Sequence, residues 1–219
     1  MSTMLRVVLE TTPKKVFASA LDWPGLARSG RDEASAVEAL RAYARRYAPI
    51  TAAAGLALDP DDLEVVVAER IPGDAGTAYG VPSQIAGADR APVSRAEALR
   101  MAALVEAAWA ELDRIAEAAP EELRKGPRGG GRDKSKMVRH VIDAEGSYAA
   151  VLGRKHNPVD AAATAAMRAD MLSILRQPSD GSGVAGRKWP ARYAARRIAW
   201  HVLDHAWEIE DRTEPAGAE

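Results

Sequence analysis

The 219-residue chain contains no cysteine, which excludes disulfide bonds, thiolate metal ligands and cysteine nucleophiles. It also lacks any uninterrupted run of about 18 apolar residues, so we expect no membrane-spanning segment. The N-terminal stretch MSTMLRVVLETTPKK has no long apolar core of the kind that a secretory signal peptide carries. The lack of cysteine leaves the compartment undecided, but without a membrane span or a signal-peptide core we expect a cytoplasmic protein without a membrane partner.

An excess of charge of one sign is also missing. The 30 lysines and arginines nearly balance the 31 aspartates and glutamates, for a formal net charge of −1. Neither the first 88 residues nor the remainder has the basic excess that drives binding to a phosphate backbone, so no nucleic-acid partner is expected. Aromatic residues make up only 5% of the chain, but 47% hydrophobic residues are enough to build a folded core.

Strand-like runs appear at the start of the chain. RVVLE (6–10) and KVFASALD (15–22) flank TTPKK, in which Pro13 favours a turn. The pair therefore predicts a β-hairpin. The next stretch, WPGLARSGRDE (23–33), contains two glycines and is interpreted as a loop.

A helix and a further strand complete the N-terminal pattern. Apolar residues recur with helical spacing in SAVEALRAYARRYAPI (35–50), and Pro49 is expected to end this helix. LEVVVAER (63–70) is β-branched and apolar at its centre, as is typical of a strand. We therefore predict a small ββαβ domain over residues 1–75, in which one helix covers a sheet.

The connection that follows is rich in residues that interrupt regular structure. Residues 71–95 contain three prolines and four glycines, which favours an extended segment between domains. We assign the linker to residues 76–95. Because so long a stretch without regular structure is unusual in a compact protein, docking as irregular structure is the alternative.

The remaining sequence has the pattern of helices. Ser94 and Glu97 predict a capping box at the start of the first one. Asp160 or Asn157 is expected to cap the third, and Pro190 is expected in the first turn of the fourth. The four predicted helices comprise residues 94–118, 134–153, 157–177 and 189–213.

Together these patterns predict an α+β protein with two domains. The four helices and the loops between them indicate an up-down four-helix bundle over residues 96–214, and residues 215–219 are expected to be a tail. The bundle would follow the small sheet-and-helix domain directly in the chain.

Three of the four histidines form a candidate metal site. His201 and His205 are four residues apart in RRIAWHVLDHAWEIEDR, so they share one face of a helix and can bind one metal ion. His140 lies in an apolar part of the second helix and completes a three-histidine site if the second and fourth helices pack together. The alternative is that these are core histidines with ordinary hydrogen bonds. His156, near a helix end, is expected to be solvated.

Carboxylates near these histidines are candidates for orienting them. Glu208 shares the helical stripe of His205, and Asp204 and Asp143 lie close to a histidine in the sequence. For Glu208, an ordinary ion pair with Arg212 is the alternative. No general base is identified.

Three arginines near the histidines are candidates for holding an anionic group. They are Arg139, Arg196 and Arg197. Solvation at the surface is the alternative for each of them. The tryptophans at helical positions are expected to be core residues, and Trp189 is expected to pack at the start of the fourth helix.

The histidine pattern carries a resemblance to a known family. Residues 96–213, with His140 in MVRHVIDAE and the later HVLDH, resemble the DinB/YfiT-like superfamily of metal-binding four-helix bundles. The end of the chain is similar to the actinobacterial branch that includes mycothiol-dependent maleylpyruvate isomerase-type proteins. The resemblance implies that His140, His201 and His205 hold a divalent metal, commonly zinc, nickel or iron. It also implies a low-molecular-weight thiol as a further cofactor, because known members include thiol S-transferases and isomerases.

The N-terminal part carries a second resemblance. Residues 5–70, with FASALDWPGLARSGRDEASAVEAL, are similar to the HicB-like antitoxin fold. The resemblance implies a fold and a protein-contact surface. A helical bundle follows in place of a DNA-binding module, and the charge is balanced, so an antitoxin activity is not expected.

Two hypotheses for the function follow. In the first, the protein is a metal-dependent thiol S-transferase or isomerase acting on a small molecule. In the second, it is a non-enzymatic protein-binding or regulatory module with a structural bundle, and it binds a protein partner or pairs with itself along a strand edge. A fusion that combines both is the third possibility.

Overall fold

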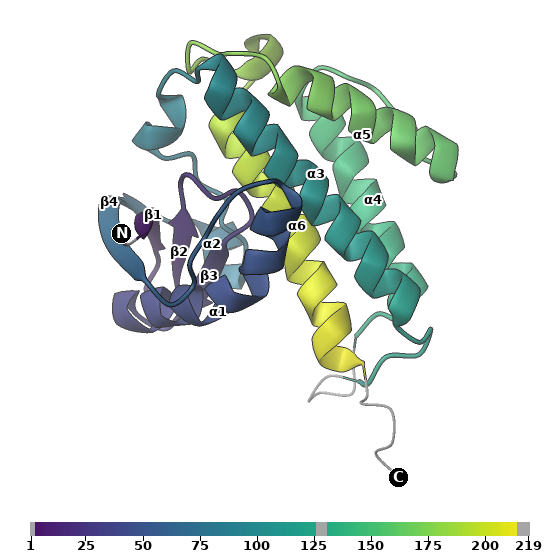
Figure 1. The fold of residues 1–219 in the computed structure, drawn as a ribbon, viewed down its shortest axis with the longest axis horizontal. Coiled ribbons are helices and arrows are strands. Elements are labelled where there is room, and N and C mark those ends of the chain that lie inside the picture. The colour runs from purple at the N-terminus through teal and green to yellow at the C-terminus, as the bar shows by residue number, and fades with distance from the viewer. Residues whose placement is uncertain (1–2, 126–130, 214–219) are drawn as a thin grey trace.

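The computed structural model describes residues 3–125 and 131–213, which form an α+β fold with a four-stranded mixed sheet and six α-helices (Figure 1). The predicted tail, residues 215–219, and the predicted last residue of the bundle, residue 214, lie outside the described residues. The strands are β1 (Thr3–Thr11), β2 (Val16–Ala20), β3 (Ala27–Gly30) and β4 (Leu63–Pro72). The α-helices are α1 (Glu33–Ala53), α2 (Ala75–Tyr79), α3 (Arg95–Ala118), α4 (Lys134–Val151), α5 (Ala161–Leu175) and α6 (Ala191–Arg212).

The sheet has the order β3-β2-β1-β4. β1 and β2 are antiparallel with Thr11 opposite Val16, and the turn between them is closed by a 2.9 Å hydrogen bond from the Thr12 amide to the Lys15 carbonyl. The predicted hairpin is therefore confirmed. β4 lies parallel to β1 and forms the other edge of the sheet, and α1 is the crossover helix between the hairpin and β4.

The expectation of a loop over residues 23–33 is wrong, because part of this stretch is strand β3. Gly25, with φ of 100°, turns the chain back, and β3 then pairs antiparallel with β2. The strand was missed because it is only four residues long and carries polar Arg28 and Ser29 without an apolar alternation. The order is thus βββαβ.

Pro49 does not end α1, which continues to Ala53. A proline inside a helix removes one backbone hydrogen bond and crowds the preceding turn. Here Ile50 and Thr51 follow it in the helix and are almost completely buried. Their burial favours continuing the helix and offsets the lost bond.

The segment predicted as a linker docks against the rest of the protein. The buried carboxylate of Glu10, in β1, accepts hydrogen bonds from the backbone amides of Ser83 (3.1 Å) and Gln84 (3.2 Å). Asp89 forms a buried two-point ion pair with Arg196 of α6, at 2.9 and 2.6 Å. The segment is therefore docked, as in the alternative, but it is not wholly irregular, because it includes most of the short helix α2.

The predicted helix starts are largely confirmed. Ser94 and Glu97 form both bonds of a capping box at the start of α3, and Asp160, not Asn157, caps α5. Pro190 differs from the expectation: it is the N-cap residue of α6, one position before the first turn.

The helices do not simply alternate in direction, as an up-down arrangement requires. α3 and α6 run the same way in Figure 1, and Arg192 near the start of α6 contacts Glu97 near the start of α3. Arg139 of α4 donates to the Pro158 carbonyl, so the chain after α4 turns back along it before α5 begins. α5 therefore runs in the same direction as α4. The connection over residues 152–160 is long enough to allow this return.

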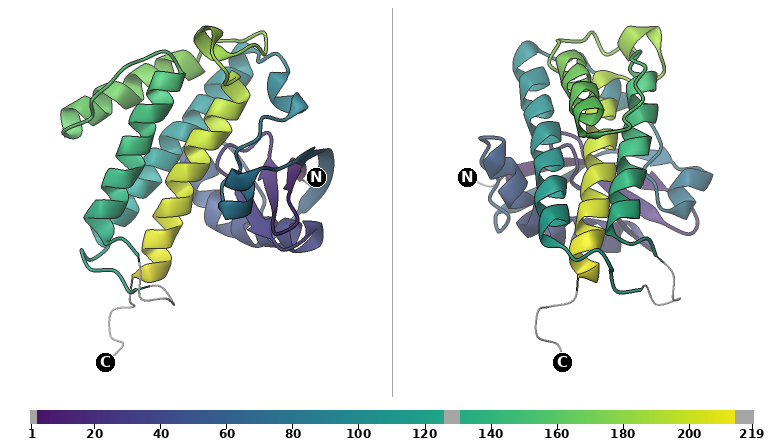
Figure 2. Two further views of the ribbon diagram at one scale, coloured as in Figure 1. Left: turned by 180° about the vertical axis from the view of Figure 1, so that it is seen from behind. Right: turned by 90° about the vertical axis from the view of Figure 1, so that its right-hand side faces the viewer.

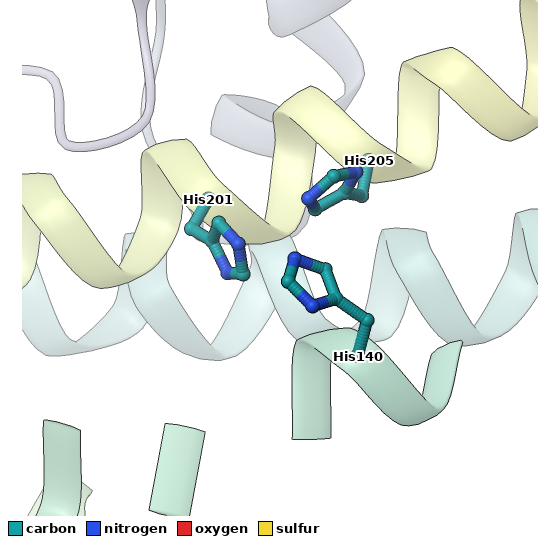
Figure 3. A group of neighbouring side chains, drawn as sticks. All are labelled: His140, His201 and His205. Carbon is teal, nitrogen blue, oxygen red and sulfur yellow. The ribbon is translucent and has the colours of Figure 1, made fainter. Parts of the chain in front are cut away.

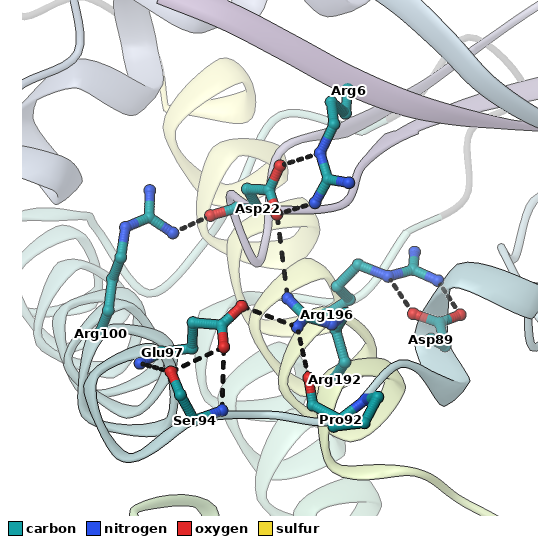
Figure 4. A network of polar contacts seen from close by, with 9 residues as sticks. All are labelled: Arg6, Asp22, Asp89, Pro92, Ser94, Glu97, Arg100, Arg192 and Arg196. Carbon is teal, nitrogen blue, oxygen red and sulfur yellow. Dashed lines mark hydrogen bonds and ion pairs between the residues drawn. The ribbon is translucent and has the colours of Figure 1, made fainter. Parts of the chain in front are cut away.

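The sheet and the helices share one hydrophobic core, which includes residues of β1, β2, α1 and α3–α6. α6 lies in the middle, between the sheet on one side and α4 on the other (Figure 2). Polar contacts add to this packing: Asp22, just after β2, contacts Arg6 of β1, Arg100 of α3 and Arg192 of α6 (Figure 4). The core thus continues across the predicted domain boundary.

The turn between β2 and β3 packs closely against the face of α6 that carries Ala199 and Leu203. If Gly25 carried a Cβ atom, this atom would lie 2.7 Å from Cδ1 of Leu203 and 3.2 Å from Cβ of Ala199. The positive φ and this close approach together favour glycine at this position. Across residues 3–125 and 131–213, no helix has both the length and the apolar character needed to cross a membrane.

Candidate metal centre

The structure brings His140, His201 and His205 together in the seam between α4 and α6. Figure 3 shows the two rings of α6 and the single ring of α4 facing one another. Ring centroids are 5.3 Å apart for His140 and His201, 5.0 Å for His140 and His205, and 4.7 Å for His201 and His205. Each residue offers a nitrogen that lies within 4.8 Å of the other two. The predicted packing of these two helices is therefore confirmed.

Local structure explains how the three rings meet. The four-residue spacing puts His201 and His205 on one face of α6, one turn apart. The opposite face carries Ala199 and Leu203, which contact the Gly25 turn. Because the Gly25 turn packs against the opposite face of α6, the face that carries the two histidines is directed toward α4.

The donor set fits a divalent ion. Metal–nitrogen bonds of about 2.1 Å in a tetrahedral site require nitrogens about 3.4 Å apart. The present separations, up to 4.8 Å, need inward side-chain movements of about 1 Å. Nδ1 of His201 is buried and has no hydrogen-bond partner in the described part of the chain, so one polar atom of this site remains to be satisfied. Three imidazoles would leave at least one coordination position open.

The surroundings favour the neutral form of two of these imidazoles, those of His140 and His201. Burial, together with the nearby charge of Arg197, lowers the pKa of His201 to about 2. Burial is also the main cause that lowers the pKa of His140. A neutral imidazole has a free lone pair, so both rings are in the form that binds a metal.

Glu208 orients the third ring. Its Oε2 lies 3.1 Å from Nδ1 of His205, and its Oε1 accepts a 3.1 Å bond from Nη1 of Arg212. Glu208 therefore makes both contacts that the sequence allows, one that orients His205 and one ion pair with Arg212. The hydrogen bond with His205 is the main cause that lowers the pKa of Glu208. A proton on Nδ1 of His205 leaves Nε2 free as a ligand.

The other two candidate carboxylates do not contact a histidine. Asp143 pairs with Arg139 on the same helix, and Asp204 pairs with Arg28 of β3 at 2.8 Å. Both form ion pairs with residues directed away from the site. Proximity to a histidine in the sequence is not sufficient to predict a contact with its ring, because each of these carboxylates pairs with an arginine instead.

The fourth histidine lies outside the group. His156 is half-buried, and its Nε2 lies 3.0 Å from Asp170 of α5, so the expectation of a solvated side chain is wrong. The segment after α4 turns back and brings it against α5. Because His156 lies outside the group, a variant at this position can serve as a control for variants of the other three histidines.

Two of the three arginines that were candidates for anion binding already have acidic partners. Arg196 pairs with Asp89, and Arg139 pairs with Asp143. Arg197 has no acidic partner in the described part of the chain.

Aromatic residues that the sequence pattern did not link to the histidines form one wall of the seam. The Tyr148 ring is 5.8 Å from the His201 ring and 5.3 Å from the Trp189 ring, between centroids. The signal was the eight-residue spacing from His140, which puts Tyr148 on the same face of α4. As expected, the other tryptophans of α3 and α6 are buried; they are Trp109, Trp200 and Trp207.

Comparisons with protein-family models, with curated proteins and with solved structures found no match to this chain. Function is therefore inferred from the chemistry of the site and from the sequence resemblances. The three converging histidines are the feature from which that inference starts.

Proposed function

We propose that the protein binds one divalent metal ion, zinc, nickel or iron, through His140, His201 and His205. In this proposal α3–α6 are a DinB-like four-helix bundle and the sheet with α1 is a HicB-like domain. The observation that supports it is the convergence of three imidazoles from two helices that are far apart in sequence. Core histidines with ordinary hydrogen bonds would have no reason to direct three ligand atoms at one point.

We further propose that the site serves a thiol-dependent transferase or isomerase acting on a small molecule. When bound, the ion would supply Lewis acidity and would lower the pKa of a coordinated thiol or water. Three uncharged ligands do not neutralise a divalent ion, so an anionic fourth ligand such as a thiolate is favoured. Because the chain has no cysteine, that thiolate must come from a low-molecular-weight thiol.

The chain's own residues prepare the site for this role. Glu208 holds His205 in one tautomer, and the buried surroundings keep His201 unprotonated. The sheet contributes indirectly: the Gly25 turn and the ion pair of Arg28 with Asp204 hold the histidine-bearing helix in position. The small domain would thus support the site without contacting the ligand.

Metal analysis of the purified protein tests the proposal. After incubation with Zn²⁺, Ni²⁺ or Fe²⁺ and removal of free metal, we expect one ion per chain. The double variant His201→Ala/His205→Ala is expected to lose the ion and to retain its far-ultraviolet circular dichroism. His156→Ala is the matched control, because it removes a histidine outside the group and should retain the ion.

The alternative is a non-enzymatic protein-binding module. The ten-residue strand β4 is an edge of the sheet and offers a place where a partner strand or a second copy can pair. Native protein that neither retains a divalent ion nor gains thermal stability when one is added would contradict the metal proposal and favour this alternative.

A further inference from the structure

The seam between α4 and α6 contains more than the three histidines. On α6, Arg197, His201 and His205 follow one another at four-residue intervals, so they form one row along the helix. On α4, His140 and Tyr148 lie on the facing side, two turns apart. The row of α6 thus begins with an arginine one turn before the first histidine.

Arg197 is the arginine of α6 that lacks an acidic partner. Arg192 pairs with Glu97, Arg196 with Asp89, and Arg212 with Glu208. Nη1 of Arg197 is buried and makes no hydrogen bond to any described residue; Nε of Arg192 and Nη2 of Arg212 are also unpaired, but these two guanidinium groups each have an acidic partner. A buried guanidinium nitrogen without an acceptor calls for a ligand, because such groups are normally satisfied.

Aromatic rings hold this guanidinium in place. Its Cζ lies 4.7 Å from the Trp200 ring centroid and 5.4 Å from that of Tyr148. Both distances are within the range of cation–π contacts, which orient the group and leave its N–H donors unused. The Tyr148 ring in turn lies 5.8 Å from the His201 ring, so it connects the arginine to the histidine group.

The surroundings determine from which side an acceptor can approach. On the sheet side, Arg197 borders a cavity of about 10 Å³, which is at the lower limit for a single water molecule. A larger acceptor must therefore come from the α4 side. There Tyr148 adds a donor: its hydroxyl makes no hydrogen bond within the described residues, and burial raises its pKa, so the proton stays on the oxygen.

The charges near this end of the seam favour an anion. Arg197 contributes positive charge at His201. The nearby carboxylates are already engaged, Glu208 with His205 and Arg212, and Asp204 with Arg28. The charge of Arg197 therefore remains without a counter-ion from these carboxylates.

We propose that Arg197 and Tyr148 form a subsite for the carboxylate of the small molecule or thiol that binds at the three histidines. This inference rests on the proposed metal site and specifies the class of its ligand. The guanidinium binds the carboxylate with two parallel N–H donors, and the Tyr148 hydroxyl donates a third bond. The carboxylate lies about one helical turn, or ~6 Å along α6, from the metal-ligating end of the molecule.

A pair of thiol probes tests the subsite in Co²⁺-loaded protein. 3-Mercaptopropionate and 3-mercaptopropionamide offer the same sulfur, but only the first has a carboxylate. Titration followed by the sulfur-to-cobalt absorption band is expected to give wild-type protein an affinity about tenfold or more higher for the carboxylate probe. In Arg197→Gln this preference should fall below about threefold, with the amide probe's affinity unchanged.

Further variants make the result specific. Tyr148→Phe is expected to lose part of the preference, and Arg197→Lys should also lose part of it, because it retains the charge without the two-pronged donor. Arg45→Gln is the charge-matched control: Arg45 lies on α1, is exposed and pairs with Asp61, so the preference should stay at the wild-type value. Retained Co²⁺ binding and circular dichroism show that each variant is folded.

A metal-free arm separates the two proposals. In chelator, propionate is expected to raise the melting temperature of wild-type protein more than propionamide at equal ionic strength, and Arg197→Gln should abolish the difference. If Co²⁺ does not bind but this difference is present, the metal site is wrong and the carboxylate subsite stands. If Co²⁺ binds but the wild type does not prefer the carboxylate probe, or Arg197→Gln retains the preference, the subsite is wrong and the metal site stands.

Discussion

Nδ1 of His205 lies 3.1 Å from Oε2 of Glu208, one turn further along α6, so one ring of the candidate metal site is held by a carboxylate of its own helix. The same carboxylate also binds Arg212. Glu208 is thereby fixed from both sides and presents a steady acceptor to the imidazole.

Removing this carboxylate should weaken metal binding. We expect Glu208→Ala to lower the affinity for Zn²⁺ by about 10- to 100-fold, because His205 loses the group that sets its tautomer and orientation. Competition with a chromophoric chelator measures the affinity. Glu210→Ala is the control, since Glu210 is exposed and pairs with Arg46 away from the histidines, and equal losses in both variants would contradict the assignment.

The contact between the Gly25 turn and α6 should be sensitive to a single methyl group. Gly25→Ala combines a positive φ with a 2.7 Å approach to Leu203, so we expect a loss of stability of about 1–3 kcal/mol beyond that of the control. The control is Gly55→Ala, at which φ is also positive but no atom lies within 4 Å of the added carbon. Urea denaturation measures both, and similar losses would show that the packing against α6 is unimportant.

The buried pair of Asp89 and Arg196 should be critical for stability. Asp89→Asn leaves the guanidinium of Arg196 buried without a counter-charge, and we expect a loss of about 3–5 kcal/mol. Asp61→Asn, which removes an exposed pair with Arg45, should change the stability by less than about 1 kcal/mol. Thermal and urea unfolding distinguish the two, and a small effect at Asp89 would mean that the docked segment contributes little.

Acid should remove the contribution of Glu97. Hydrogen bonds from the backbone and side chain of Ser94, with a further bond from Arg192, lower the pKa of Glu97 to about 2 in the folded protein, below its ordinary value of 4.5 (Figure 4). A carboxylate whose pKa is lowered by folding stabilises the fold above its ordinary pKa and loses this effect as the pH falls toward the folded value.

The variant Glu97→Gln should therefore have a lower melting temperature than the wild type near pH 7, and the difference should shrink between about pH 4.5 and pH 2. Melting curves of metal-free protein at several pH values measure this. A difference that stays constant over that range would show that the charge of Glu97 is not what stabilises the start of α3.

Several elements could be predicted from short stretches of sequence. The sequence predicts the hairpin around Pro13 and the capping box of Ser94, and it narrows the cap of α5 to Asp160 or Asn157, because each depends on interactions between residues a few positions apart. The shared face of His201 and His205 follows in the same way from helical geometry.

Other features required the complete fold. β3 is a strand because β2 offers it an edge, and α1 continues past Pro49 because burial of the following residues outweighs a lost hydrogen bond. The direction of α5 depends on a connection whose course the residues do not specify. These outcomes depend on partners distant in the sequence.

The candidate site also depends partly on local sequence and partly on tertiary contacts. The spacing of His201 and His205 is local and is visible in the sequence, whereas their meeting with His140 depends on α4 packing against α6. Likewise, only tertiary contacts assign Asp143 and Asp204 to other cations and leave Arg197 without an acidic partner. Local bonding sets which residues share a face of a helix, and burial of apolar surface over the whole chain sets which faces meet.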